Sequence, residues 1–456
     1  MENNNSFERV LGTKDILALA FGAMIGWGWV ILTGSWIQQA GTFGAMIAFG
    51  IGGTMIIFVG LVYSELTAAL PKAGGAAVFS YKAMGANGSF ICTWALILGY
   101  VGVVAFEACA FPTVVEYIIP GFLVGHMYTI AGFDVYASWV GVGALLSVII
   151  TFINYRGTKD SAFLQKILVV VIAVAGIALM LSSPVSGNLS NTMPLIRAGW
   201  SGILAVVIAT PFMFIGFDVI PQTAAEINLP FNKIGKTLML SIFMAVLWYV
   251  LIIFAVGYLM TDQQISSSVL VTADAMKAGF GGSELAAKAL IIAGLAGIVS
   301  SWNAFLMGGS RAMYALAQNK MLPGFLGKLH PKYKTPSNAI LLIGTISTIA
   351  PFFGKSMMGW LVNAGSFGIV LAYVMVSISF VIIRKKFPDM ERPYAVKNHK
   401  FVGGMAVILT ILMLLAYLPG MISTEWLIVG MWAVLGLVFY SLAKKKYADF
   451  GIEVSD

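Results

Sequence analysis

Two interrupted apolar segments are the places in this chain where backbone groups could bind a ligand. The first is GAMIGWGW at Gly22–Trp29, and the second is TPFMFIGFD at Thr210–Asp218. A bilayer offers no water to an unwound backbone, so such breaks survive only where protein buries them or where they line a cavity. Free N–H groups at a break bind a carboxylate, and free carbonyl groups bind an ammonium group or a cation. Glycines also serve close helix packing, but a break in each half of the chain favours a transporter binding site.

Two acidic residues lie in apolar surroundings, where a carboxylate costs about 3 kcal/mol on insertion scales. Asp218 is close to Pro221, which favours a structural residue near a helix end, where most of that cost is avoided. Glu107 lies past the middle of an apolar segment, in VAFEACAFP, and is a candidate for proton transfer or for binding an amine. The alternative for Glu107 is a neutral, hydrogen-bonded acid within a helix bundle.

The composition indicates a polytopic membrane protein. Of the 456 residues, 59% are hydrophobic and only 10% are charged, and the mean hydropathy is +0.91. Apolar stretches long enough to cross a bilayer as helices recur along the chain. They predict twelve spans, near residues 15–37, 43–66, 89–118, 135–154, 163–183, 200–221, 237–260, 284–316, 338–353, 359–384, 402–420 and 425–443.

Lysine and arginine predict the orientation, because basic loops stay on the cytoplasmic side. With the N-terminus inside, only Arg197, Lys277, Lys288 and Lys355 lie outside, which leaves 23 of the 27 basic residues inside. We therefore expect a multi-pass protein of the cytoplasmic membrane with cytoplasmic tails at 1–14 and 444–456. The net charge of +8 is explained by this topology, and no basic patch interleaved with exposed aromatics suggests nucleic-acid binding.

Four ordered segments resemble the amino acid/polyamine/organocation permeases. The loop predicted after the second span, YSELTAALPKAGGAAVFSYKAMG at 63–85, is similar to a signature of that superfamily. NYRGTKDSAFLQK at 154–166, GFDVIPQTAAEINLP at 216–230 and SRAMYALAQNKMLPGFLGKLHPKYKTPSNA at 310–339 resemble its later segments in the expected order. The resemblance covers nearly the whole chain and indicates the superfamily rather than a particular substrate.

The resemblance implies an all-α bundle of two inverted repeats of five helices each. The first repeat would be residues 15–183, the second 200–384, and two further helices at 402–443 would lie outside them. Helices 1 and 6 would be broken at the two interrupted segments.

The resemblance also implies a substrate site at the breaks. The substrate amine would meet the carbonyl groups of Met24 and Ile25, and its carboxylate would meet the amides of Trp27 and Gly28. Phe212 matches an aromatic lid over the substrate, unless it is a packing residue. Trp27 is larger than the residue common in the superfamily, so it either points away or shrinks the site. The substrate-binding residues expected are Met24, Ile25, Gly26, Trp27, Gly28, Glu107, Phe212 and Ile215.

The coupling ion stays open between a proton and sodium. Proton-linked members carry a lysine where this chain has Ile172, and Lys166 is better explained by a side chain that reaches water at a helix end. Sodium-coupled relatives use two adjacent hydroxyl residues, for which this chain offers GIVSSWN at 297–303. The sodium ligands implied are Gly22, Ile25, Gly297, Ser300 and Ser301, although serine pairs also bond within helices without binding an ion.

These features favour a secondary active transporter of an amino acid. No GxxxxGK[ST] phosphate loop, clustered catalytic residues or channel selectivity ring is visible, so an ATP-driven pump, an enzyme and a channel are disfavoured. A polyamine or small-amine transporter, or an exchanger without ion coupling, is the alternative. We expect no cofactor other than sodium as a candidate coupling ion, and the number of subunits stays open.

Overall fold

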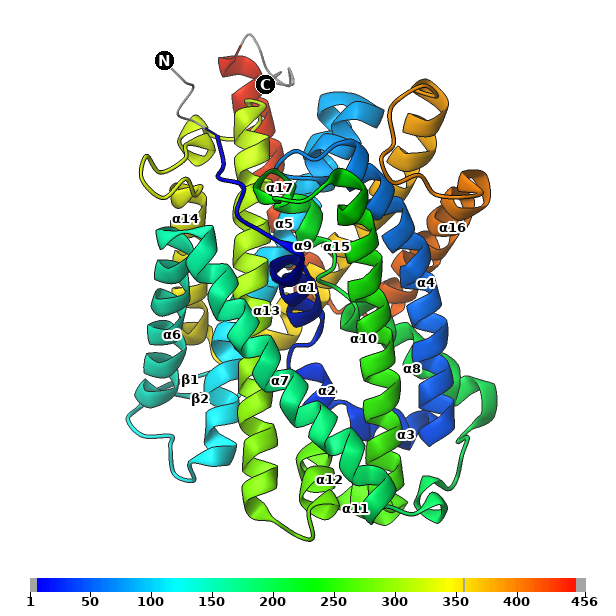
Figure 1. Cartoon of the computed structure of the whole chain (residues 1–456). Coiled ribbons are helices and arrows are strands. Elements are labelled where there is room, and N and C mark those ends of the chain that lie inside the picture. Colours follow the sequence, from blue (N-terminus) through cyan, green and yellow to red (C-terminus); the bar gives the residue numbers. More distant parts are fainter. Residues whose placement is uncertain (1–5, 356, 448–456) are drawn as a thin grey trace.

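The computed structural model describes residues 6–355 and 357–447 of the chain. Most of the structure is helical, and the long helices run in roughly the same direction through the molecule. The segment before the first helix and the last turn of the last helix lie at the same end of the bundle (Figure 1). The chain is thus a bundle of apolar helices, as its composition predicts.

The elements of the first half follow one another with short connections. They are α1 (Thr13–Met24), α2 (Gly28–Ile31), α3 (Thr33–Ala40), α4 (Thr42–Ala69), α5 (Ala76–Ile118), β1 (His126–Ile130), β2 (Phe133–Tyr136), α6 (Ala137–Arg156), α7 (Thr158–Ser186) and the 3-10 turn η1 (Leu189–Thr192).

The second half has the same character. Its elements are α8 (Gly199–Met213), α9 (Val219–Gln222), η2 (Ala224–Glu226), α10 (Phe231–Leu259), α11 (Asp262–Ser267), α12 (Val271–Gly279), α13 (Glu284–Gln318), η3 (Gly324–Gly327), α14 (Ser337–Ile349), η4 (Ala350–Phe353), α15 (Met357–Lys386), α16 (His399–Tyr417), η5 (Leu418–Gly420) and α17 (Ser423–Lys446).

Nine helices within the described residues are long and apolar enough to cross a membrane, and two shorter apolar helices, Gly199–Met213 and Ser337–Phe353, accompany them. This is fewer than the twelve spans predicted. The difference arises because the first predicted span is divided among α1, α2 and α3, the sixth is divided between α8 and α9, and the ninth is short.

The local structure differs from the expectations in two details. The chain is not purely helical, because β1 and β2 form a short antiparallel hairpin between α5 and α6. The segment 63–85, expected as a loop, is mostly helical and turns only between α4 and α5. Inside α5, Gly85 has a φ of 73°, a backbone conformation that glycine adopts at little cost, so the helix bends before it enters the bundle.

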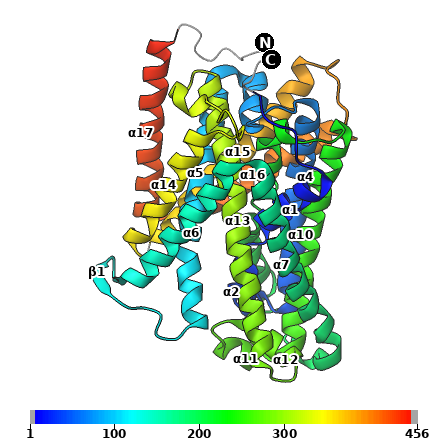
Figure 2. The ribbon, with the colours of Figure 1, turned by 60° about the vertical axis from the view of Figure 1, so that its left-hand side comes forward.

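The bundle centre is formed by α1, α5, α13 and α15, with α4 against α10 and α6 against α14. The last two helices lie farther out, and Figure 2 shows α17 along one side of the bundle. A stacked pair, Trp94 of α5 and Trp432 of α17, holds it there: each indole nitrogen donates to the other residue's carbonyl oxygen at 2.9 Å. Most of the remaining surface of α17 is apolar and exposed, as expected for a helix that faces lipid.

A short strand-like contact fixes the segment before α1. Leu11 forms a parallel bridge with Ile227, and the amides of Val10 and Leu11 both donate to the Glu226 carbonyl oxygen at 2.9 Å. The amide of Asn228 donates back to the Leu11 carbonyl at 2.9 Å. The start of the first helix is therefore tied to the segment that follows the second break.

Candidate functional site

The two breaks touch each other at the centre of the bundle. α1 ends at Met24 and α8 ends at Met213. Gly216, between α8 and α9, has a φ of 133°, and a Cβ added there would lie 2.6 Å from the Ala23 Cβ and 2.9 Å from the Met24 nitrogen. Only glycine allows so close an approach of two backbones, so this residue brings the two unwound segments together.

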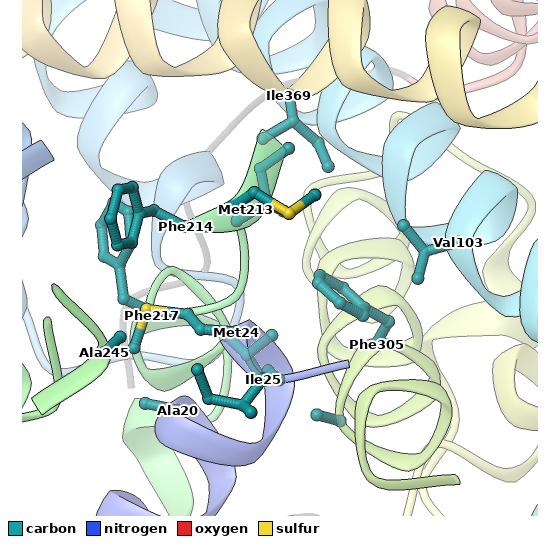
Figure 3. Close-up of a cluster of buried hydrophobic side chains, with 14 of the residues drawn as sticks. Ala20, Met24, Ile25, Val103, Met213, Phe214, Phe217, Ala245, Phe305 and Ile369 are labelled. Atoms are coloured by element: carbon teal, nitrogen blue, oxygen red, sulfur yellow. The ribbon is translucent and has the colours of Figure 1, made fainter. Parts of the chain in front are cut away.

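A cavity of about 360 Å³ lies against both breaks and extends to Lys355, beside the start of α15. Its walls come from the first break, α5, the end of α8, α13 and α15, and they are largely apolar. Figure 3 shows Met213, Phe305 and Val103 in the same cluster of buried apolar side chains as Met24 and Ile25 of the first break. The polar or charged residues among the described lining are Glu107, Thr113, Tyr117, Tyr249, Ser301 and Lys355.

The carbonyl groups of the first break are closely held. The Tyr249 hydroxyl of α10 donates to the Met24 carbonyl oxygen at 2.9 Å. A Cβ added at Gly297 of α13 would lie 2.6 Å from the Gly26 oxygen and 3.0 Å from the Ile25 oxygen. Met24 thus already has a donor, whereas the Ile25 and Gly26 carbonyls face the Gly297 backbone.

The amide groups of the first break are available. Within the described residues, no backbone acceptor pairs with the N–H groups of Gly26, Trp27 or Gly28, and all three residues line the cavity. Unpaired N–H groups at the start of a helical segment are suited to a carboxylate.

Glu107 is the one acidic residue in the described cavity lining. Its side chain is only 3% exposed. Its Oε1 accepts a hydrogen bond from the Ser301 hydroxyl, while its buried Oε2 has no hydrogen-bond partner. An unpaired buried carboxylate oxygen is costly, and an ammonium group or a proton at Oε2 would remove that cost.

The aromatic and aliphatic residues expected at the site also line the cavity. Phe212 is half-buried and Ile215 is buried, and both contribute to the wall. Trp27 lines the cavity too, and its ring packs against Gly294 of α13, where an added Cβ would clash with it. The site therefore accommodates this large side chain through a glycine on the facing helix.

The residues expected to bind sodium gather where α1 meets α13, but their hydroxyl groups have other partners. Gly22 packs directly on Ser300. The Ser300 Oγ accepts a hydrogen bond from the Gln165 amide at 2.8 Å, and the same amide nitrogen donates to the Ala18 carbonyl at 3.3 Å. Ser301 donates to Glu107. An ion at this place would compete with the Gln165 amide.

Lys166 and Ile172 of α7, the two positions considered for proton coupling, do not line the cavity. Lys166 forms an ion pair with Asp15 of α1 at 2.8 Å, and Ile172 is fully buried. The α7 residue that reaches α1 and Ser300 is instead Gln165, whose Oε1 accepts from the Asn303 amide at 2.8 Å.

Asp218 lies at a helix end, at the N-cap of α9, but it is buried there, so only the expectation that it avoids most of the burial cost was wrong. Its side chain is fully buried and accepts hydrogen bonds from the hydroxyl of Tyr100, from the hydroxyl of Tyr373 at 2.8 Å, and from the Gly216 amide at 3.0 Å. Tyrosine donors on α5 and α15 thus compensate the carboxylate. The cluster joins these two helices to the second break.

A buried ion pair lies beyond this cluster, beside the strand-like contact of Leu11. Arg311 of α13 donates to both carboxylate oxygens of Glu226, at 2.7 and 3.1 Å, and to the Thr158 hydroxyl at 3.0 Å. Both charged side chains are 1% exposed. This bidentate pair joins η2, α7 and α13 at the end of the bundle where α17 finishes.

Sequence reasoning missed the residues that support the site. Tyr249, Gly294, Gln165 and Phe305 lie in uninterrupted helices, where no break, charge or motif distinguishes them from packing residues. Tyr100 and Tyr373 also lie in apolar helices, and the only signal was that Asp218 required a partner.

The chain is similar to known transporters along nearly its whole length. A family described as "Amino acid permease" matches residues 11–439. The branched-chain amino acid permease BcaP of Bacillus subtilis is 26% identical over 97% of this chain and 94% of its own length. The methylthioribose transporter of the same organism is 24% identical, over 98% of this chain and 95% of its own. The aspartate-proton symporter, also of Bacillus subtilis, is 26% identical over 97% of this chain and 85% of its own length.

Proposed function

The chain belongs to the amino acid permease family, and on this premise we propose that it is a secondary active transporter that moves an amino acid across the cytoplasmic membrane by alternating access. The observation that carries the proposal is the cavity at the two touching breaks, with unpaired amides on one side and the free Glu107 carboxylate oxygen on another. Such a site offers a partner for each end of an amino acid.

We propose twelve spans in two inverted repeats. The first span would comprise α1–α3 and the sixth α8–α9, with the repeats at residues 15–183 and 200–384 and the last two spans at 402–443. The packing of α4 on α10, α5 on α13 and α6 on α14 supports it, because these are the second, third and fourth spans of each proposed repeat. Two related breaks are the usual mark of such repeats.

We propose that both termini are cytoplasmic. Basic residues support this orientation, since Arg384, Lys385 and Lys386 end α15 and Lys444, Lys445 and Lys446 end α17 at the same end of the bundle. The cavity, which extends toward Lys355, then opens to the outside. The tails 1–14 and 444–456 would face the cytoplasm, although residues 1–5 and 448–456 are outside the described residues.

The proposed substrate is an α-amino acid with an apolar side chain. Its carboxylate would meet the amides at 26–28, and its ammonium group would meet Glu107 Oε2. The walls supplied by Met213, Phe305 and other apolar residues would bury its side chain. The name of the BcaP relative, a branched-chain amino acid permease, supports the apolar class.

Alternating access needs a barrier on the inner side that can open. We propose that the Asp218 cluster and the Glu226–Arg311 pair form it, because both lie between the cavity and the end at which α17 finishes. Each joins helices through side-chain hydrogen bonds, which can break and re-form without unfolding a helix. The strand-like contact of Leu11 would make α1 move with the segment after α9.

We propose a proton as the coupling ion and keep sodium as the second candidate. Glu107 supports the proton, because a neutral carboxylic acid fits the apolar cavity when no ammonium group is bound. The name of the aspartate-proton symporter supports it as well. The gathering of Gly22, Gly297 and Ser300 supports sodium, with Ile25 and Ser301 as further ligands, but the ion would have to displace the Gln165 amide.

Two other modes of action follow from the same site. A small amine or polyamine would use Glu107 and the carbonyl groups and leave the amides at 26–28 unused. An exchanger without ion coupling would need neither a proton nor sodium. The unpaired amides favour an amino acid over an amine.

Transport in proteoliposomes tests the proposal. We expect uptake of labelled L-leucine to depend on a proton gradient and to stop when the gradient is collapsed. Uptake driven by sodium and abolished in the Ser300→Ala/Ser301→Ala variant would identify sodium as the coupling ion instead. Uptake that requires only internal amino acid would identify an exchanger. Saturable uptake of amines but of no amino acid would contradict the proposed substrate.

A further inference from the structure

A groove on the outer surface of the bundle shares no lining residue with the cavity. It has a volume of about 560 Å³ and runs between α6 and α14. Its lining includes Val148, Thr151 and Phe152 on α6 and Leu341, Thr345 and Ile349 on α14. Its α14 side extends over nine residues, or about 12 Å of helix, which is comparable to a large part of one acyl chain.

The groove is a built feature of the contact between the two helices. Gly344 forms its floor, and a Cβ added there would lie 2.9 Å from the Thr151 Cβ. Thr348 donates to the Ser147 hydroxyl at 3.0 Å and to the Gly344 carbonyl oxygen at 2.8 Å, so its hydroxyl group is paired. The rims are apolar and open, since Val148 and Phe152 are 53% and 56% exposed.

One end of the groove carries positive charge. The Arg156 guanidinium lies 5.8 Å from the ring centre of Phe152, and Phe152 lines the groove. Its acidic neighbour Asp160 is 3.9 Å away, and both side chains are more than half exposed, so this pair neutralises Arg156 weakly.

A second cation is connected to the same end of the groove through aromatic contacts. Tyr155, which lines the groove, packs its ring against His330 and Tyr333. The Lys332 ammonium lies 5.4 Å from the Tyr333 ring centre. Arg156 of α6 therefore contacts a groove-lining residue directly, whereas Lys332, in the segment before α14, is linked to the groove end through Tyr333 and Tyr155.

We propose that the groove binds an anionic phospholipid. One acyl chain would lie along the apolar walls, and the phosphate would meet Arg156 and Lys332 with the Tyr155 hydroxyl as a further donor. A guanidinium fits a phosphate through paired hydrogen bonds, and an aromatic belt of this kind is typical of the membrane interface. The proposed transport activity is not needed for this site.

Lipid retention by the full-length protein tests the proposal. The protein would be purified from bilayers of phosphatidylglycerol and phosphatidylcholine with matched acyl chains, and the lipid retained per molecule would be measured by native mass spectrometry. We expect preferential retention of phosphatidylglycerol. Two cations near a membrane surface correspond to a preference of roughly 30-fold, which Arg156→Gln/Lys332→Gln should abolish.

Two further variants separate the groove from general surface charge. Lys444→Gln/Lys445→Gln removes the same charge from α17 and should keep the preference. Thr345→Trp fills the groove without changing charge and should reduce retention of both lipids at this site. Equal retention of both lipids by the unchanged protein, an unaltered preference in Arg156→Gln/Lys332→Gln, or an equal loss in the α17 variant would overturn the proposal. Inorganic phosphate alone should not compete, and full displacement by it would show an ion site instead of a lipid site.

Discussion

The unpaired Oε2 of Glu107 allows a quantitative prediction about substrate binding. Glu107→Gln keeps the shape of the side chain and can still accept from Ser301, but it removes the charge at the position where Oε2 lacks a partner. A hydrogen bond to a charged group contributes about 1.5–3 kcal/mol. At about 1.4 kcal/mol per factor of ten, we expect a loss of roughly 10- to 150-fold in affinity for an apolar amino acid.

A matched ligand shows whether the loss comes from the ammonium group. The α-hydroxy acid with the same side chain lacks that group, so its affinity should be nearly unchanged by Glu107→Gln. Both affinities can be measured by competition against labelled amino acid on the purified protein. Met358→Leu, which alters the same cavity wall without a charge, serves as the control. If Glu107→Gln weakened the amino acid and the hydroxy acid by the same factor, Glu107 would not bind the amine.

Three other substitutions test separate parts of the structure. Trp27→Ser should widen the range of accepted side chains in a competition assay, because the indole forms a cavity wall; unchanged selectivity would remove Trp27 from the site. Gly297→Ala should abolish transport in a folded protein, because the added Cβ would clash with the Gly26 carbonyl oxygen. Gly404→Ala adds a Cβ that contacts no other atom, so it should leave uptake unchanged in the same assay. Arg311→Met should destabilise the protein by about 3–5 kcal/mol in chemical unfolding, because the Glu226 carboxylate stays buried without its cation. Arg311→Met/Glu226→Leu should recover most of this loss, and no recovery would mean that Arg311 acts through other contacts.

The sequence predicts those helices well whose positions depend only on a local run of apolar residues. The span expected at 43–66 corresponds to α4, and the breaks expected at 22–29 and 210–218 fall where α1 and α8 end. These features depend on local apolar runs and on glycine or proline, which act within a few residues. The short hairpin β1–β2 escaped prediction because it lies almost entirely in the connection between the spans expected at 89–118 and 135–154, where hydropathy indicates no element.

Contacts between distant helices could not be predicted in the same way. Nothing local in the sequence indicates that Gln165 bonds to Ser300 or that Tyr249 bonds to the Met24 carbonyl. Asp218 illustrates the limit: its burial cost was evident, but its two tyrosine donors lie 118 and 155 residues away in sequence. A single sequence shows that a partner is needed and does not show which residue it is.

The bridge between Leu11 and Ile227 also bears on how the protein is made. Residue 227 follows residue 11 by 216 positions, and ribosomes add about 5–20 residues per second. The first helix therefore leaves the ribosome roughly 10 to 40 s before the segment that completes its N-terminal contact is synthesised. During that interval its unwound segment has neither Gly216 nor Gly297 to pack against, so the first helix reaches its final place only when the second half of the bundle has been inserted.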